Sequence, residues 1–160
     1  MNIELMVNLK NNLSLPNTVA KSEGLSISEI EKIEKKYNKG KEFPKAFREY
    51  LFLAGEYFNG GFDTLGEGLN QLQEYAKEDL EKTKQKVDKP FFAFHVYDGL
   101  YSVIFLDETN EDPKVYMIDP FEALEGSTLV SIPKGGFKEN YTFTELVNES
   151  IRRVKNNISF

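Results

Sequence analysis

Residues 91–106 read FFAFHVYDGLYSVIFL, and this stretch decides the fold. Two runs of apolar and aromatic residues flank the pair Asp98-Gly99, which supplies the positive φ angles of a two-residue type I′ turn. Each run has the length and the β-branched and aromatic content of a strand. The sequence therefore predicts an antiparallel hairpin with its turn at residues 98–99.

The turn also predicts the register of the hairpin. Counting back from it places Tyr97 opposite Leu100, Val96 opposite Tyr101, Phe94 opposite Val103 and Phe92 opposite Phe105. One face would then be core, and it consists of Phe92, Phe94, Val96, Tyr101, Val103 and Phe105. The opposite face, with His95 and Ser102, is mixed in polarity and is expected to be partly covered.

Helices and further strands are predicted on both sides of the hairpin. Ser26 with Glu29, and Thr142 with Glu145, stand at capping-box spacing before amphipathic patterns. The predicted helices cover 27–38, 43–54, 69–87 and the residues from 142 onward; further strands are predicted at 115–118 and 129–132. This order predicts an α+β single domain, with an antiparallel sheet built round the hairpin 91–106 and helices packed on one face.

Length and composition favour one globular domain. The chain has 160 residues, 40% of them hydrophobic, and it contains no cysteine. It shows neither a secretory signal pattern nor an apolar run of about 20 residues, so a cytoplasmic protein without a membrane partner is expected. Residues 1–24 are interpreted as a leader, in which alternating Ile3, Leu5 and Val7 allow a short strand before a loop. The domain itself is placed at 25–160.

Acidic residues are concentrated in the second half of the chain. Residues 91–133 contain eight acids and one base, whereas the whole chain has a net charge of −6. A focused negative field speeds encounter with a basic partner and repels nucleic acid. From charge alone, however, the preferred interpretation is a solvated surface that keeps the protein soluble.

No motif predicts catalysis, a cofactor or a metal site. His95 is the only histidine, and although Ser102 is its expected cross-strand neighbour, both lie in mid-strand, away from any loop that would build an oxyanion hole. The acids of 107–112 lack calcium-loop spacing, and the glycines of 60–68 lack a phosphate-binding fingerprint. These patterns favour a protein-binding module over an enzyme.

Three segments together resemble a known family. They are SISEIEKIEKKY at 26–37, FPKAFREYLFLAG at 43–55 and PFFAFHVYDGLYSVIFLDETNEDPKVYMID at 90–119. In order and spacing they resemble the SUKH superfamily, the yeast cell-wall-synthesis-regulator type domain that is also found in bacterial immunity proteins. The resemblance covers about residues 25 to 155.

The resemblance implies an α+β domain that works by binding another protein. In bacteria such proteins look like immunity partners that neutralise a polymorphic or contact-dependent toxin, often a nuclease, by occluding it. The yeast-type regulators carry long disordered flanks, which this 160-residue chain lacks. This difference favours the stand-alone bacterial interpretation. A regulatory or scaffold domain that does not inhibit its partner is the alternative, and a small hydrolase is a distant one.

The partner-binding residues are expected at the hairpin tip and in the loops between strands, where binding residues are usually presented. The exposed aromatics of this region are candidate anchors, because aromatics dominate binding hot spots. The candidates are Tyr97, Asp98, Asp107, Glu108, Glu111, Asp112, Phe121 and Glu122.

Overall fold

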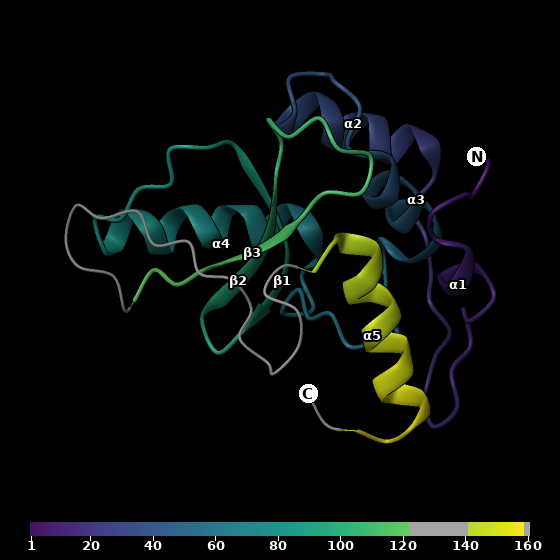
Figure 1. The fold of residues 1–160 in the computed structure, drawn as a ribbon. Helices are drawn as coiled ribbons and strands as arrows, with labels where there is room; N and C mark the ends of the chain where they lie inside the picture. Colours follow the sequence, from purple (N-terminus) through teal and green to yellow (C-terminus); the bar gives the residue numbers. More distant parts are fainter. Residues whose placement is uncertain (122–140, 159–160) are drawn as a thin grey trace. The chain divides into compact units, whose positions relative to one another are not determined.

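The computed structural model describes residues 1–121 and 141–158 (Figure 1). In chain order its elements are α1 (Val7–Lys10), α2 (Ile27–Tyr37), α3 (Lys45–Ala54), α4 (Gly68–Lys82), β1 (Phe91–Tyr97), β2 (Leu100–Phe105), β3 (Val115–Ile118) and α5 (Phe143–Lys155). The strands form one antiparallel sheet in the order β1-β2-β3. The α+β single domain is thus confirmed, while the strand predicted at 129–132 lies outside the described residues.

Residue contacts group this domain into two compact units. Among the described residues, unit 1 comprises 1–62, 109–113 and 142–158, and unit 2 comprises 63–108, 114–121 and 141. Unit 1 holds α1, α2, α3 and α5, whereas unit 2 holds α4 and the sheet. Each unit is therefore assembled from segments that are distant in sequence.

Both helices with predicted capping boxes begin where the sequence indicates. The Ser26 hydroxyl accepts the Glu29 N–H, and the Glu29 carboxylate accepts the Ser26 N–H at 2.8 Å, so each satisfies an orphan donor of α2. Thr142 and Glu145 exchange the same two hydrogen bonds at the start of α5. These local contacts fix the first turns independently of tertiary packing.

The core of unit 1 is a cluster of aromatic rings. Helix α5 packs against α1 and α3, and this brings the Phe143 ring edge-on to Phe47 with 5.1 Å between the ring centroids. Tyr50 also meets Phe143 edge-on, at 5.1 Å. Edge-to-face pairs of this kind add to the free energy of burying the rings. Residues from the two ends of the chain therefore share one core.

Residues 1–24 lie within unit 1 and do not form the short strand that their apolar alternation allows. Instead of a strand, α1 forms at Val7–Lys10, and Met6 and Leu9 are buried. The Glu49 carboxylate of α3 accepts the N–H groups of residues 4, 5 and 6 at 2.8–3.0 Å, although its side chain is only 1% exposed. This buried acceptor, distant in sequence, holds the segment in a turn that alternation of apolar residues does not reveal.

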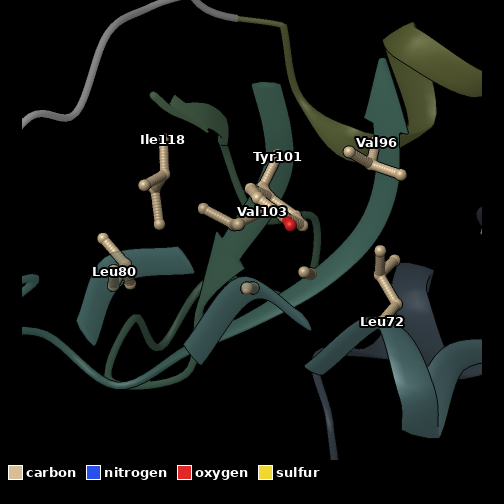
Figure 2. Packing of buried hydrophobic residues seen from close by; sticks show 8 residues of the cluster. Leu72, Leu80, Val96, Tyr101, Val103 and Ile118 are labelled. Carbon is tan, nitrogen blue, oxygen red and sulfur yellow. The ribbon is translucent and has the colours of Figure 1, made fainter. Parts of the chain in front are cut away.

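The core of unit 2 lies between α4 and one face of the sheet. Leu72 and Leu80 of α4 pack against Val96, Tyr101 and Val103, as Figure 2 shows. Ile118 of β3 completes the cluster. Helix α4 ends at Lys82 rather than at residue 87, because the backbone turns back there and the Gln85 N–H donates to the Leu80 carbonyl.

A β-bulge at Phe94 corrects the predicted register. The pairs next to the turn are as expected, but Phe94 has no partner on β2, so Ala93 lies opposite Val103 and Phe92 opposite Ile104. One extra residue moves every preceding side chain to the other face of the sheet. Helix α4 therefore covers the face of Ala93 and Val103, while Phe92 lies on the opposite face, where it is also buried.

The outer edge of β1 is closed by hydrogen bonds within unit 2. The Gln73 amide donates to the Ala93 carbonyl at 2.7 Å and accepts the Ala93 N–H at 2.8 Å. Further along the strand, the Val96 N–H donates to the Asp63 carbonyl at 3.0 Å. An edge strand with its backbone groups satisfied in this way is a poor template for another strand.

Candidate binding surface

The candidate acids of unit 2 lie at opposite ends of the hairpin. Asp98 is in the turn that joins β1 to β2, whereas Asp107 and Glu108 follow the far end of β2. The six residues of β2 span about 20 Å at the usual rise of a strand. These carboxylates therefore do not form one cluster.

The other candidate acids are divided as well. Glu111 and Asp112 belong to unit 1, where Asp112 Oδ1 accepts the Thr144 N–H at 2.9 Å in the first turn of α5. The Glu111 carbonyl accepts the Ala46 N–H at 2.9 Å, while its side chain is exposed. Glu122 lies outside the described residues. Asp112 thus has a structural role within unit 1.

The hairpin tip brings together three candidates from two segments. Asp98 and Gly99 have φ angles of +48° and +79°, which confirms the left-handed pair of the predicted turn. Phe121 follows β3 and reaches the same turn: a Cβ built on Gly99 would lie 3.1 Å from two carbons of its ring. Tyr97, the last residue of β1, directly precedes the turn.

The two aromatic side chains at this tip are exposed. Tyr97 is 71% and Phe121 59% accessible to solvent, and Asp98 in the turn is exposed too. The Phe121 N–H donates to the Asp119 carboxylate at 2.9 Å, and Asp119 is itself buried. The tip therefore presents apolar rings and a carboxylate on a defined backbone, which is the composition of a protein-binding surface.

Net charge separates the two units. Over the described residues, unit 1 has 12 acidic and 12 basic side chains, whereas unit 2 has 11 acidic and 6 basic ones, a net charge of −5. Most of the chain's formal charge of −6 is thus located in unit 2. Because α4 and its flanking loops contribute as well as the hairpin, the charged region is broader than the sequence interpretation had it.

Several carboxylates of unit 2 accept hydrogen bonds from tyrosine hydroxyls. Glu108 accepts from Tyr116 at 2.9 Å, and Asp79 accepts from Tyr101 at 2.6 Å. Burial, and then the hydrogen bond to Glu108, raise the pKa of Tyr116 to about 12. Burial and the bond to Asp79 raise the pKa of Tyr101 as well. Asp79 and Glu108 therefore help to hold the sheet, in addition to carrying charge.

His95 holds a loop to β1. Its Nδ1 accepts the Asp63 N–H at 2.7 Å, and burial lowers the pKa of the imidazole, which favours the neutral ring. Ser102 is its cross-strand neighbour, as the sequence predicted. In a catalytic triad one imidazole nitrogen acts as the general base and the other is bound by the residue that orients the ring. In His95 the Nδ1 atom instead binds the loop at Asp63.

A shallow groove in unit 1 is lined by both signs of charge. It has a volume of about 650 Å³ and lies beside Glu34, Glu42 and Arg48. Buried Glu34 accepts the Phe43 N–H at 2.8 Å and pairs with Arg48 Nε at 3.0 Å. Burial raises the pKa of Glu34, although both contacts favour its charged form. This carboxylate joins α2 to the start of α3.

Nowhere in 1–121 or 141–158 do three or more histidine, cysteine, aspartate or glutamate side chains gather as a metal-ion site would require. Within the same ranges, each helix is too short or too polar to cross a bilayer.

Sequence reasoning missed the three buried polar residues Glu34, Glu49 and Gln73. Their signal was a polar side chain within an otherwise apolar helix face.

Comparison of the chain with protein-family models and with curated proteins finds no match to either.

Proposed function

We propose that the chain is a protein-binding domain that recognises a basic partner through unit 2. The observation that carries this proposal is the separation of charge: unit 2 has a net charge of −5 over its described residues, whereas unit 1 is neutral. A field confined to one part of a molecule steers and orients an oppositely charged partner during encounter. If the acidic residues served solubility alone, an excess of negative charge would be expected in both units.

The more specific proposal is that of an immunity protein. It rests on the resemblance of residues 25–155 to the SUKH superfamily, whose bacterial members look like partners of polymorphic or contact-dependent toxins. A nuclease toxin would have a basic active surface, since it must bind phosphates. An acidic domain that covers this surface would neutralise the toxin by occlusion, without any chemistry of its own.

A capture experiment with two charge variants tests this proposal. The tagged protein is used to capture partners from the source organism, and captured proteins are identified by mass spectrometry. One variant reverses three exposed acids of unit 2: Glu78→Lys, Glu81→Lys and Asp107→Lys. The matched control makes the same change in unit 1: Glu23→Lys, Glu31→Lys and Glu56→Lys. All six side chains are exposed.

The partner should be a basic protein that the unit 2 variant loses and the unit 1 variant retains. Capture should also weaken toward 1 M salt, where the Debye length falls to roughly 3 Å. Expression of the captured domain alone should stop growth, and co-expression of this chain should restore it. Equal capture by both variants would contradict recognition through unit 2, and a harmless partner would contradict the immunity role.

A further inference from the structure

We propose that the tip of the β1–β2 hairpin binds one arginine side chain of the basic partner. In this arrangement the guanidinium pairs with the Asp98 carboxylate and lies against the ring of Tyr97 or Phe121. The inference rests on the proposed function, since it assigns the residue by which a basic partner would anchor to unit 2.

Asp98, like Asp107 at the other end of the hairpin, differs from most carboxylates of unit 2 because no described residue pairs with its carboxylate. Asp79 and Glu108 accept tyrosine hydroxyls, and Asp119 accepts a backbone N–H. By contrast, no hydrogen bond or ion pair joins the Asp98 carboxylate to another described residue. It lies in a turn that follows exposed Tyr97 and that exposed Phe121 contacts at Gly99, so its charge is available to a partner.

The Phe121 ring and the backbone of the tip are held in position before any partner arrives. The Phe121 ring rests on Gly99, where a methyl group would already lie 3.1 Å from it, and the Phe121 N–H is bound by buried Asp119. Tyr97 is held by the strand pairing of its backbone with Leu100. A surface that is ordered beforehand loses less conformational entropy on binding, and this favours affinity.

The chemistry of the tip favours arginine over an apolar anchor. An apolar side chain docked on the tip would cover the Asp98 carboxylate without pairing with it, which is costly. A guanidinium satisfies the carboxylate with paired N–H donors, and its flat face also stacks on aromatic rings. The net negative charge of unit 2 attracts the same side chain.

The test compares two substitutions that remove the same charge from unit 2. Binding of a hexa-arginine peptide to the full-length protein is measured at low salt, with hexa-citrulline as the neutral control peptide. Asp98→Asn should weaken binding about 5-fold, because it removes an ion pair from the anchor site. Asp107→Asn, at the other end of the hairpin, should weaken it less than about 2-fold. Asparagine is well tolerated at positive φ, so the turn should survive.

Ring removal gives an independent measurement. Tyr97→Ala or Phe121→Ala should weaken hexa-arginine binding about 2- to 5-fold, as expected for an exposed cation–π contact. Tyr57→Ala removes an exposed tyrosine from unit 1 and should leave binding unchanged.

The two proposals fail in different ways. If Asp98→Asn and Asp107→Asn weaken binding equally, or if neither ring matters, the tip is not the anchor, while recognition of a basic partner by unit 2 stands. If the unmodified protein binds hexa-arginine no better than hexa-citrulline, both the tip assignment and the charge-based recognition are wrong.

Discussion

Units 1 and 2 use buried polar side chains in different ways. In unit 1 the charged carboxylate of Glu49 accepts three backbone N–H groups and so ties the first residues of the chain to α3. In unit 2 the neutral amide of Gln73 meets both the N–H and the carbonyl of Ala93, closing the edge of β1. Both contacts satisfy backbone groups that burial would otherwise leave unpaired.

The difference follows from what each backbone segment presents. Three N–H groups that point to one place need only an acceptor, and a carboxylate provides acceptors alone. A strand edge presents both a donor and an acceptor, and a side-chain amide can pair with both. In unit 1, Glu34, Glu49 and Glu149 are engaged by N–H groups or arginines. In unit 2 a surplus of acids is left over. Polar side chains thus support the backbone in both units, whereas the excess negative charge is confined to unit 2.

The largest expected effect is on the aromatic core of unit 1. Phe47→Ala should lower the free energy of unfolding by about 3–5 kcal/mol, since it removes a fully buried ring that contacts Phe143. Denaturant titration followed by circular dichroism measures this change. Phe47→Leu, which keeps most of the volume, should cost clearly less. A loss below about 1 kcal/mol for Phe47→Ala would mean that unit 1 does not depend on this cluster.

Replacing the Gln73 amide with a carboxyl tests the hydrogen bonds at the edge of β1. Gln73→Glu keeps the shape of the side chain but removes the donor for the Ala93 carbonyl and introduces a buried charge. We expect a loss of about 3 kcal/mol at pH 7. Burial should raise the pKa of the new carboxyl, so its protonated form, which can donate, should regain stability as pH falls toward about 4. A loss that does not depend on pH would contradict the assigned hydrogen bonds.

The reverse exchange in unit 1 should have a smaller effect. Glu49→Gln retains one acceptor oxygen but turns an amide donor toward backbone donors, so we expect a loss of about 2 kcal/mol. Glu56→Gln removes the same charge from an exposed position of unit 1 and should change stability by less than about 0.5 kcal/mol. Equal effects of the two substitutions would show that the three N–H bonds contribute nothing.

The smallest expected effect concerns acid stability. Arg152 and Arg153 both pair with Glu149 and, together with hydrogen bonding, lower its pKa from 4.5 to about 2. The folded state therefore binds this proton less readily than the unfolded state does. Its contribution is complete above about pH 4.5 and is lost as pH falls toward 2.

The Glu149→Gln variant isolates this contribution. The difference in unfolding free energy between the two proteins should be about 1 kcal/mol or less at pH 7, because the arginine pairs are near the surface. It should shrink toward zero near pH 2. A difference that stays constant between pH 2 and 7 would contradict the ion pairs as its source.

Features that depend on neighbouring residues could be predicted from the sequence, whereas contacts between distant residues could not. The capping boxes at Ser26 and Thr142 and the Asp98-Gly99 turn were predicted correctly, since each depends on residues within three positions of one another. The bulge at Phe94 was not predicted, because four successive apolar residues can be buried on either face of a strand. Nothing local marks Glu49 as the acceptor for residues 4–6, which lie more than 40 positions away.

The candidate surface was predicted only in part. The residues of the tip, Tyr97, Asp98 and Phe121, do come together, because the hairpin turn and the following strand could be placed from the sequence. The acids between β2 and β3 were assigned to partner binding because they lie in a loop between strands. Their actual surroundings depend on α3 and α5, to which the loop 109–113 bonds within unit 1.

The interleaved segments of the two units imply an order of assembly during synthesis. Helix α5 contacts α1 and α3, and Asn148 accepts a hydrogen bond from Asn8, 140 positions earlier. The hairpin and α4 lie close together in the chain, so they pay a small loop-closure cost and can pair while later residues are still being made. The N-terminal helices must wait for residues 142–155 before their aromatic rings are covered. In a nascent chain the apolar residues of the N-terminal helices, which are made first, would therefore stay exposed the longest. Aggregation or chaperone capture competes with folding until residues 142–155 have been made.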